Sequence, residues 1–292
     1  MTNAVPGSDP SRVLRVAGPT ATVQMGGDVR EARVAPRLPG RPLVVGDRVE
    51  VRETGDDLVI TALLPRATQL ERASGPDGPR RVVVANADVL FVVESLTRPE
   101  SRPHLIDRYL IAAWVGHLDA ALILTKADLC DDPAGGDSLA ALYRGLGYPV
   151  LVGSAKEPAF VADVLRLVDG RVAALVGQSG VGKSTLARGL TGVERAVGVV
   201  SDRDGTGRHT TSDPRLIPLP DKGAIVDTAG VRTLFLPRLD PADLGDAFPE
   251  IREIAGQCQF RDCRHLGEPG CALPGRMAPT RRESYELLGE NP

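Results

Sequence analysis

Lysine is scarce in this sequence of 292 residues, which contains 31 Arg but only 4 Lys. Three of the four lysines, Lys126, Lys156 and Lys183, lie in the short motifs described below. Lysine carries a compact ammonium on a thin, flexible side chain, whereas the arginine guanidinium is broad and planar. Because arginine serves almost everywhere else, a retained lysine marks a position that needs the smaller cation.

Long apolar runs are also missing, and none approaches the about 20 residues that a membrane-spanning helix needs. The longest apolar region, residues 82–93, is interrupted by Asn86 and Asp88. The first residues have neither the basic nor the apolar segment of a signal peptide. We therefore expect a cytoplasmic protein. The net charge of −3 does not indicate a nucleic-acid-binding protein, so any such binding would need a local patch.

Cysteine is rare, with 4 residues, but three of them lie close together beside a histidine. The cluster consists of Cys258, Cys263, His265 and Cys271. Three thiolates and one imidazole can fill a tetrahedral Zn²⁺ site with no open position, which indicates a structural site. The odd count and the expected cytoplasmic location disfavour disulfides. A C-terminal segment of about 45 residues buries little apolar surface, and a bound metal would stabilise it.

The N-terminal part shows the pattern of a small β-barrel. Residues 12–64 contain five short alternating runs separated by Gly, Pro and Asp, which predicts five strands joined by turns. Residues 1–11 are expected to form a disordered tail. Residues 65–81 contain three Pro, two Gly and no core pattern, which predicts a linker.

From residue 82 to about residue 240 the pattern alternates between strands and helices, which predicts a mostly parallel sheet covered on both faces. Strands are expected at 89–93, 121–124, 150–152, 172–176 and 224–226, and helices at 103–115, 138–146, 161–168 and 183–190. Ligands of such sheets bind beyond the carboxyl ends of the strands. Residues 241–292 form a further unit, with helices expected over 241–254 and from Thr280, where Thr280 and Glu283 could form a capping box.

A glycine-rich motif follows one of these predicted strands and opens a predicted helix. Residues 177–184, GQSGVGKS, match the phosphate-binding pattern G-x-x-x-x-G-K-[ST]. Its glycines let backbone N–H groups turn towards phosphates, and the helix N-terminus adds a positive end. Lys183 can reach the β- and γ-phosphates, and the Ser184 hydroxyl can coordinate Mg²⁺. The expected binding residues are Gly177, Gln178, Ser179, Gly180, Val181, Gly182, Lys183, Ser184 and Thr185.

Two further segments fit a γ-phosphate and its metal ion. Asp227 ends a predicted strand in the motif DTAG, where its carboxylate can hold a Mg²⁺-bound water and the Gly230 N–H can contact a γ-phosphate. The polar loop 205–216 is placed to act as a switch that closes Thr210 or Thr211 onto Mg²⁺. The expected magnesium ligands are Ser184, Thr210, Thr211 and Asp227.

Two polar motifs earlier in the chain favour guanine as the base. In Thr125-Lys126-Ala127-Asp128, the Asp128 carboxylate can accept from guanine N1–H and N2–H₂, and the Lys126 stem can lie along the base. In Ser154-Ala155-Lys156 a backbone N–H could meet guanine O6. Each motif alone is a weak signal, but both follow predicted strands in a chain with a phosphate loop. The base loop precedes the phosphate loop, which is the usual GTPase set in rotated order.

With these motifs the chain resembles the RsgA (YjeQ) family of bacterial, circularly permuted GTPases. The resemblance covers nearly the whole chain and includes residues 45–51, 105–110 and 207–211 beside the motifs above. It implies a multidomain protein with an OB-like β-barrel, a central circularly permuted α/β P-loop GTPase domain and a C-terminal zinc-binding module with helices. The sequence departs from the family pattern at Thr125, Ala229 and Ser212, where Asn, Pro and Thr are usual.

The resemblance also implies an activity and partners. It implies weak intrinsic GTP hydrolysis, strong stimulation by the small ribosomal subunit, and a role late in maturation of that subunit. GTP or GDP, Mg²⁺ and one structural Zn²⁺ are the implied cofactors. The barrel and the zinc module would contact ribosomal RNA. We expect a monomer without membrane contacts.

Catalysis is expected to involve Lys183 and His209. Many GTPases place a water-orienting Gln directly after D-x-x-G, but Val231 stands there and has no polar group. His209 is the best substitute, an expectation that the resemblance supports. It could instead be a surface residue or an RNA contact. Two other function classes stay open, a small-molecule kinase or ATPase and a non-catalytic RNA-binding factor gated by nucleotide.

Overall fold

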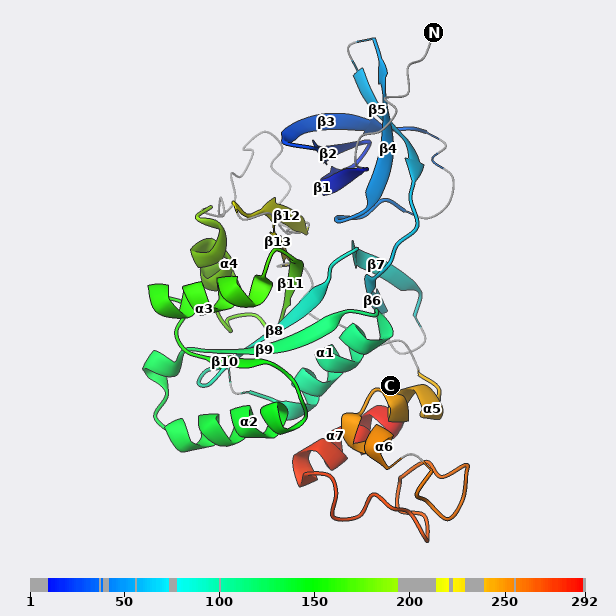
Figure 1. Ribbon diagram of the computed structural model, residues 1–292, viewed down its shortest axis with the longest axis vertical. Coiled ribbons are helices and arrows are strands. Elements are labelled where there is room, and N and C mark those ends of the chain that lie inside the picture. The colour runs from blue at the N-terminus through cyan, green and yellow to red at the C-terminus, as the bar shows by residue number, and fades with distance from the viewer. Residues whose placement is uncertain are drawn as a thin grey trace, which may run out of the picture.

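The computed structural model describes residues 10–36, 38, 42–55, 57–73, 78–99, 101–193, 214–220, 223–228, 239–254 and 256–290. Along the chain it shows a β-barrel, a central α/β unit and a C-terminal helical unit (Figure 1). Among the described residues, none of the helices has the length and apolar character needed to cross a membrane.

The N-terminal barrel closes in the order β1-β2-β3-β5-β4. Its strands are β1 (Ser11–Ala17), β2 (Thr20–Met25), β3 (Asp28–Val34), β4 (Arg48–Thr54) and β5 (Asp57–Leu63). Alternation sends one set of side chains inward, and Val13, Val23 and Ile60 are completely buried. The predicted five-stranded barrel is confirmed.

The central unit is a six-stranded sheet in the order β10-β9-β8-β11-β13-β12. Its strands are β8 (Val89–Ser95), β9 (Asp119–Thr125), β10 (Val150–Val152), β11 (Val172–Val176), β12 (Arg215–Pro218) and β13 (Ala224–Asp227). All pairs are parallel except β12 with β13. The central strands are apolar almost throughout, because helices cover both of their faces.

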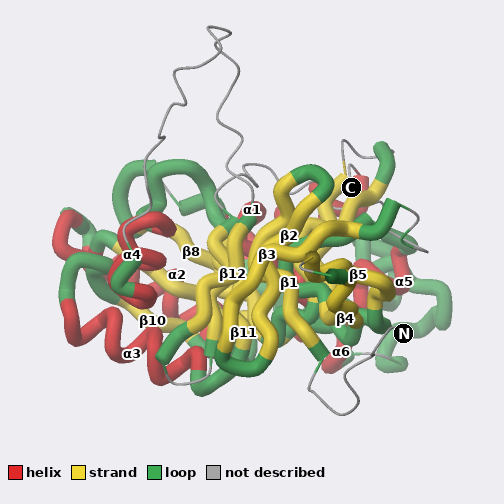
Figure 2. Tube along the Cα trace, turned by 90° about the horizontal axis from the view of Figure 1, so that it is seen from above, coloured by secondary structure: helices red, strands yellow, loops and turns green. Residues whose placement is uncertain are grey.

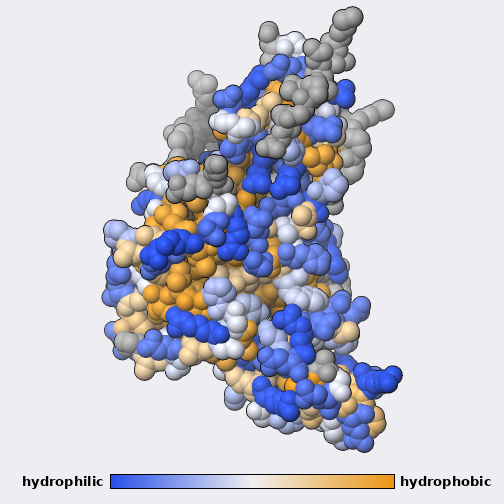
Figure 3. Space-filling model, viewed as in Figure 1, coloured by the Kyte–Doolittle hydropathy of each residue, from blue (hydrophilic) through white to orange (hydrophobic). Residues whose placement is uncertain are grey.

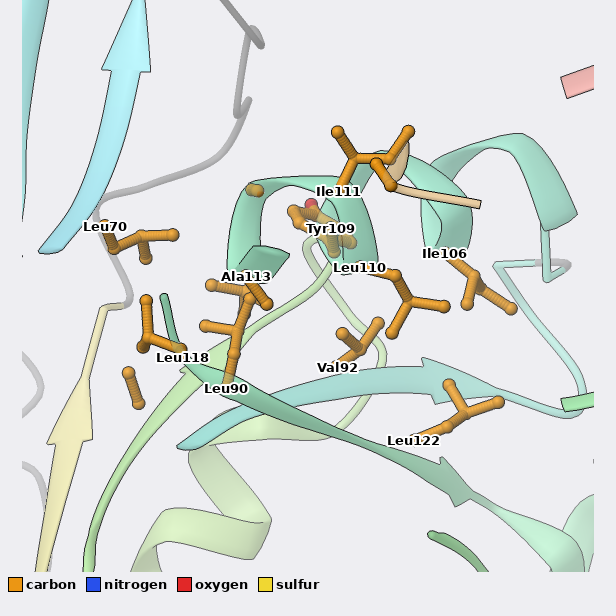
Figure 4. Packing of buried hydrophobic residues seen from close by; sticks show 14 of the residues in the cluster. Leu70, Leu90, Val92, Ile106, Tyr109, Leu110, Ile111, Ala113, Leu118 and Leu122 are labelled. Atoms are coloured by element: carbon orange, nitrogen blue, oxygen red, sulfur yellow. The ribbon is translucent and has the colours of Figure 1, made fainter. Parts of the chain in front are cut away.

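Helices α1 (Pro103–Val115) and α2 (Pro133–Gly145) pack on one face of the sheet, and α3 (Pro158–Val168) and α4 (Lys183–Thr191) pack on the other. Strand β8 shows how the faces divide. Leu90 and Val92 pack under α1 against Ile106, Tyr109 and Leu110 (Figure 4). The alternate β8 residues belong to the core shared with α3 and α4. Each face of β8 therefore serves a different helical layer.

The structure differs from the predicted linker over residues 65–81. There β6 (Gln69–Ala73) pairs antiparallel with β7 (Arg80–Ala85), and Leu70 is completely buried. A five-residue strand with only two buried apolar residues, Leu70 and Ala73, leaves little periodicity in the sequence, so the linker prediction missed it. Buried Arg66 also pairs with Asp47 at 2.7 Å and joins this segment to the barrel.

The barrel and the central unit are also in direct contact. The Asn86 side-chain amide donates to the Gly46 carbonyl at 3.0 Å, and Val45 forms a β-bridge with Val84. Strand β1 lies against β12, the edge strand of the central sheet (Figure 2). In the space-filling view, hydrophilic residues cover much of the barrel and C-terminal unit, while hydrophobic residues reach the surface of the central unit (Figure 3).

The C-terminal unit contains α5 (Pro241–Asp246), α6 (Pro249–Glu253) and α7 (Pro279–Glu290). One helix was expected over 241–254, but Pro249 cannot donate a backbone hydrogen bond and starts a new helix. The last helix begins at Pro279, one residue before the expected start, because proline favours the first helical position. Thr280 therefore lies inside α7, where its carbonyl accepts from Ser284.

A buried ion network attaches this unit to α1. Arg281 on α7 donates two hydrogen bonds to Glu250 on α6, at 2.9 and 2.8 Å, and a third to Asp107 on α1. Its guanidinium carbon lies 4.4 Å from the Phe248 ring centroid. The Tyr143 hydroxyl donates to Asp107 at 2.7 Å. One arginine thus joins α7 and α6 to the face of the central sheet that α1 and α2 cover.

Candidate functional site

The glycine-rich loop lies between β11 and α4, at the carboxyl end of the sheet. Gly177, Gly180 and Gly182 have φ angles of 143°, 85° and 104°, in the region that favours glycine. A Cβ atom on Gly177 would lie 2.0 Å from the Val93 carbonyl oxygen, so this position admits glycine only. The loop can therefore present a series of backbone N–H groups to an anion.

Lys183 is the first residue of α4, and its ammonium folds back into this loop. Nζ donates to the Gly177 carbonyl at 2.6 Å and also to the Gln178 carbonyl. Burial lowers the pKa of Lys183, while the charges of Glu94 and Asp227 act in the opposite direction. The ammonium thus stands where an anion bound by the loop would meet it.

Thr125 joins the predicted base loop to the phosphate loop. It ends β9, is completely buried, and its hydroxyl lies within hydrogen-bond distance of the Val181 carbonyl. The Glu94 carbonyl lies 3.1 Å from the same hydroxyl. The sequence assigns Thr125 to the base-reading segment, but the structure turns its side chain towards the phosphate loop.

Asp128 stands beside the second predicted base motif. It lies in the short 3₁₀ helix η1 (Ala127–Leu129), after Lys126 with a left-handed φ of 61°. Its carboxylate is 3.5 Å from the Lys156 ammonium. A hydrogen bond from Ser154 and the charge of Lys156 hold the pKa of Asp128 below its usual range. The carboxylate therefore stays ionised at neutral pH, as an acceptor of two donors must.

Backbone contacts fix the relative position of these loops. The Ala127 N–H donates to the Gly153 carbonyl at 3.1 Å, which joins the loop of residues 125–128 to the loop of residues 153–156. The Lys126 ammonium donates to the Arg98 carbonyl, in the segment after β8. Pro99 in the same segment lies next to Gly180 of the phosphate loop. Four segments far apart in the sequence thus meet at one edge of the sheet.

The predicted magnesium site is only partly within the described residues. Asp227 ends β13 and is buried, and Ser184 and Thr185 follow Lys183 in the first turn of α4 with exposed side chains. The side chains of Gln178 and Ala155 are half-buried, and that of Ser179 is exposed. His209, Thr210, Thr211 and Gly230 lie outside the described residues.

Sequence analysis missed one residue of this edge. Glu94, near the end of β8, is completely buried, and neither carboxylate oxygen has a hydrogen-bond partner among the described residues. Burial raises the pKa of Glu94 to about 7, against the nearby charges of Lys183 and Arg102. The available signal was a glutamate directly after the apolar run VLFVV, which is an unusual place for a carboxylate.

The structure brings the four predicted zinc ligands together. Their ligand atoms all lie within 4.8 Å of one another. His265 Nδ1 is 3.6, 3.8 and 3.5 Å from the sulfur atoms of Cys258, Cys263 and Cys271. Tetrahedral zinc, with bonds of about 2.0–2.3 Å, separates its ligand atoms by about 3.5–3.8 Å. This donor set therefore fits a zinc ion.

Backbone N–H groups support two of the sulfur atoms. The Ala272 N–H donates to Cys258 Sγ at 3.3 Å, and the Leu273 N–H donates to Cys271 Sγ at 3.4 Å. Such bonds favour thiolate over thiol and orient the ligands. Cys130 is not part of this cluster and is half-buried.

Comparison with known proteins gives the family of this chain. The family model described as RsgA GTPase matches residues 63–237. A small ribosomal subunit biogenesis GTPase RsgA of Azotobacter vinelandii is 42% identical over 276 residues, and the match covers 91% of this chain and 79% of that protein. The protein of the same name from Pseudomonas putida is 40% identical over 271 residues, covering 90% of this chain and 78% of the relative.

Solved structures give the same result for the fold. The crystal structure of YjeQ from Thermotoga maritima matches with a TM-score of 0.76 and 27% identity, covering 97% of this chain and 98% of that one. The structure described as YloQ, a circularly permuted GTPase, matches with a TM-score of 0.75 and 24% identity, covering 98% and 95%. The predicted fold class is confirmed, and the chain belongs to the RsgA GTPase family.

Proposed function

We propose that this protein hydrolyses GTP to GDP and phosphate, and that it binds the small ribosomal subunit and assists its late maturation. The observation that carries the proposal is the meeting of a base loop and a phosphate loop at one sheet edge, joined through Thr125 and Val181. Membership of the RsgA GTPase family supports the activity. The names of the relatives support the small subunit as partner.

The nucleotide would lie along this edge, with its base at η1 and its phosphates at the start of α4. Asp128 would accept from guanine N1–H and N2–H₂. Lys126 would lie along the base, while Ala127 and the loop of Ser154, Ala155 and Lys156 would surround its edge. Residues 177–185 would surround the phosphates. Lys183 would leave its loop carbonyls for the β- and γ-phosphate oxygens.

Ser184, Asp227 and the switch residues Thr210 and Thr211 are proposed to hold Mg²⁺ beside these phosphates. Of the two threonines, one would be the direct ligand. When bound, the ion would neutralise phosphate charge. Ser184 offers its hydroxyl from the first turn of α4, and Asp227 offers a carboxylate, directly or through water. The Gly230 N–H would contact the γ-phosphate.

Slow hydrolysis by the protein alone is proposed from its own residues. Val231 has no polar group with which to orient a water molecule, and His209 would act only when the small subunit is bound. We propose that His209 then positions the attacking water. Lys183 would stabilise charge on the transferring phosphoryl group.

The cysteine cluster is proposed to hold one structural Zn²⁺ through Cys258, Cys263, His265 and Cys271. Four protein ligands leave no position for a reacting molecule. The OB-like barrel and this zinc-binding module are proposed to contact ribosomal RNA. The protein would act as a cytoplasmic monomer without membrane contacts.

Replacement of Asp128 by Asn tests the choice of base. An amide at this position loses the paired acceptor for guanine but suits xanthine, which carries an oxygen in place of the 2-amino group. A good paired contact is worth about 1–3 kcal/mol. We therefore expect weaker GTP binding and stronger xanthosine triphosphate binding, each by about fivefold to a hundredfold.

The neighbouring exposed residue Asp131 gives the control, because Asp131→Asn makes the same chemical change outside the base contact. Binding would be measured with both triphosphates and with ATP. A wild-type protein that binds ATP as well as GTP, or an Asp128→Asn variant with unchanged preference, would instead favour a small-molecule kinase or ATPase.

A further inference from the structure

Glu94 places a carboxyl group close to the phosphate loop. In β8, Leu90 and Val92 point towards α1 (Figure 4), and alternation continues this face to Glu94. Its side chain is completely buried, and both carboxylate oxygens lack a hydrogen-bond partner among the described residues. Its backbone carbonyl lies 3.1 Å from the Thr125 hydroxyl, which also contacts the loop. A buried carboxyl group without partners is costly when it is ionised.

The charged groups around Glu94 come from three places in the fold. Lys183 at the start of α4 and Arg102, directly before α1, stabilise the ionised carboxylate. Asp227 at the end of β13 acts on Lys183 as well. On α1, burial, together with the charge of Glu94, raises the pKa of Tyr109 to about 12. The phenol therefore keeps its proton near neutral pH, whereas Glu94 can titrate there.

We propose that Glu94 is a positioning residue of the phosphate site that takes up one proton when nucleotide binds and releases it when nucleotide leaves. This inference rests on the proposed nucleotide site. The proton comes from solvent and converts the carboxylate to a carboxylic acid, and no other bond changes. In the free protein the Glu94 carboxylate balances the positive charge of Lys183. In the nucleotide-bound protein Glu94 is a neutral carboxylic acid.

The exchange follows from what Lys183 does. In this structure its ammonium donates to the carbonyls of Gly177 and Gln178. The ammonium is also close enough to Glu94 for its charge to stabilise the ionised carboxylate. Bound phosphates would engage the ammonium and bring several negative charges into the same poorly hydrated region. A nearby negative charge and a weakened counter-charge both favour the neutral carboxyl group. The carboxylate form consequently opposes phosphate binding, and the acid form does not.

The sign of the pH dependence follows by linkage. Nucleotide binding raises the pKa of Glu94 above its value in the free protein, so the bound state holds more protons. Affinity is then highest below about pH 7, where the free protein is already protonated. It falls as the pH rises through the free-state pKa, and it levels off above the bound-state pKa. Each unit between the two pKa values changes affinity about tenfold.

The test compares Glu94→Gln with the wild type in binding of fluorescently labelled GDP between pH 6 and pH 9, at fixed Mg²⁺. Glutamine has the same shape as the protonated carboxyl group but does not titrate. Asp119→Asn serves as the control for loss of a carboxylate. Asp119 is the first residue of the neighbouring strand β9, so it lies at the amino ends of the strands, away from the phosphate loop at their carboxyl ends. We expect the affinity of wild type and control to fall at least about threefold more than that of Glu94→Gln across this range.

Calorimetry in two buffers with different ionisation enthalpies measures the proton directly. At pH 7.5 the wild type should take up more protons on GDP binding than Glu94→Gln, while protonation of GDP itself contributes equally to both. Should Glu94→Gln fail to fold, Glu94→Met gives a second non-titrating side chain. Equal pH dependence and equal proton uptake would overturn this inference and leave the nucleotide site standing. A wild type that binds no nucleotide at any pH would overturn both.

Discussion

At the scale of single residues, buried polar groups hold the two nucleotide loops together. Thr125 is the clearest case, since its hydroxyl lies between the Glu94 carbonyl of β8 and the Val181 carbonyl of the phosphate loop. The Thr125 side chain is short and completely buried, so it does not extend to the proposed position of the base. Its contribution is therefore to the shape of the phosphate loop.

Replacement of Thr125 by Val should destabilise the protein and weaken nucleotide binding together. Valine keeps the volume but leaves a buried carbonyl without its donor, which costs about 1–3 kcal/mol. Urea unfolding and labelled-GDP binding measure the two effects. Thr61→Val is the control, because the Thr61 hydroxyl lies in the barrel and its hydrogen bond to the Glu50 carbonyl is long, at 3.5 Å. Equal small losses in both variants would contradict this role for Thr125.

The motifs could be found in the sequence because each has a fixed residue pattern at a predicted strand end. The side-chain direction of Thr125 could not be predicted from the sequence. It depends on β8 and β11 lying side by side, although they are far apart in the chain. The same holds for Glu94. Its position after an apolar run was visible, but its burial near Lys183 depends on the assembled sheet.

At the scale of elements, the contact between α7 and α1 contains a buried arginine. Arg281 is 2% exposed and lies between Asp107 of α1 and Glu250 of α6. Burial raises the pKa of Asp107, and the charge of Arg281 opposes that shift. The arginine thus gives two buried carboxyl groups a cationic hydrogen-bond donor at the junction of two structural units.

Arg281→Met should destabilise the protein by about 3–5 kcal/mol at pH 8, because it leaves two buried carboxylates without a cation. Burial already raises the pKa of Asp107, and loss of the Arg281 charge would raise it further above the value of the unfolded chain, so stability would be lost as the pH rises. We therefore expect a smaller deficit at pH 5 than at pH 8, measured by urea unfolding. Arg282→Met removes a partly exposed pair with Glu286 and should cost less than about 1 kcal/mol. A loss in Arg281→Met that is small or independent of pH would contradict the argument.

Most long elements could be predicted because their apolar periodicity is strong, and α1 has the predicted bounds of Pro103–Val115. The exceptions have local reasons. Strand β12 has four residues at the sheet edge and gives no periodicity of its own. The division of 241–254 at Pro249 could have been predicted, since a proline inside a helical pattern ends or bends the helix.

At the scale of the whole molecule, the order of the motifs decides which parts of the chain are connected. Strand β13 ends at Asp227, and the chain continues from there into the C-terminal unit at α5. That unit returns to α1 through Arg281, and α1 follows the segment whose Arg98 carbonyl contacts Lys126 of the base loop. The C-terminal unit is therefore attached to the nucleotide domain through the chain and through packing.

The rotated order could be read directly from the sequence, because the motifs are short and keep their own spacing. The packing of α7 on α1 could not, since the partners of Arg281 are separated from it by 31 and 174 positions. Among 31 arginines, nothing in the sequence marks this one as buried.

The proposed function is tested by GTP turnover with and without purified small ribosomal subunits, with large subunits as the control. We expect slow turnover by the protein alone, an increase of at least about tenfold with small subunits only, and loss of that increase in His209→Ala. Full stimulation of His209→Ala would remove the proposed role of His209. Unchanged turnover in the presence of small subunits, with GTP still bound, would contradict the account and leave a nucleotide-gated binding protein.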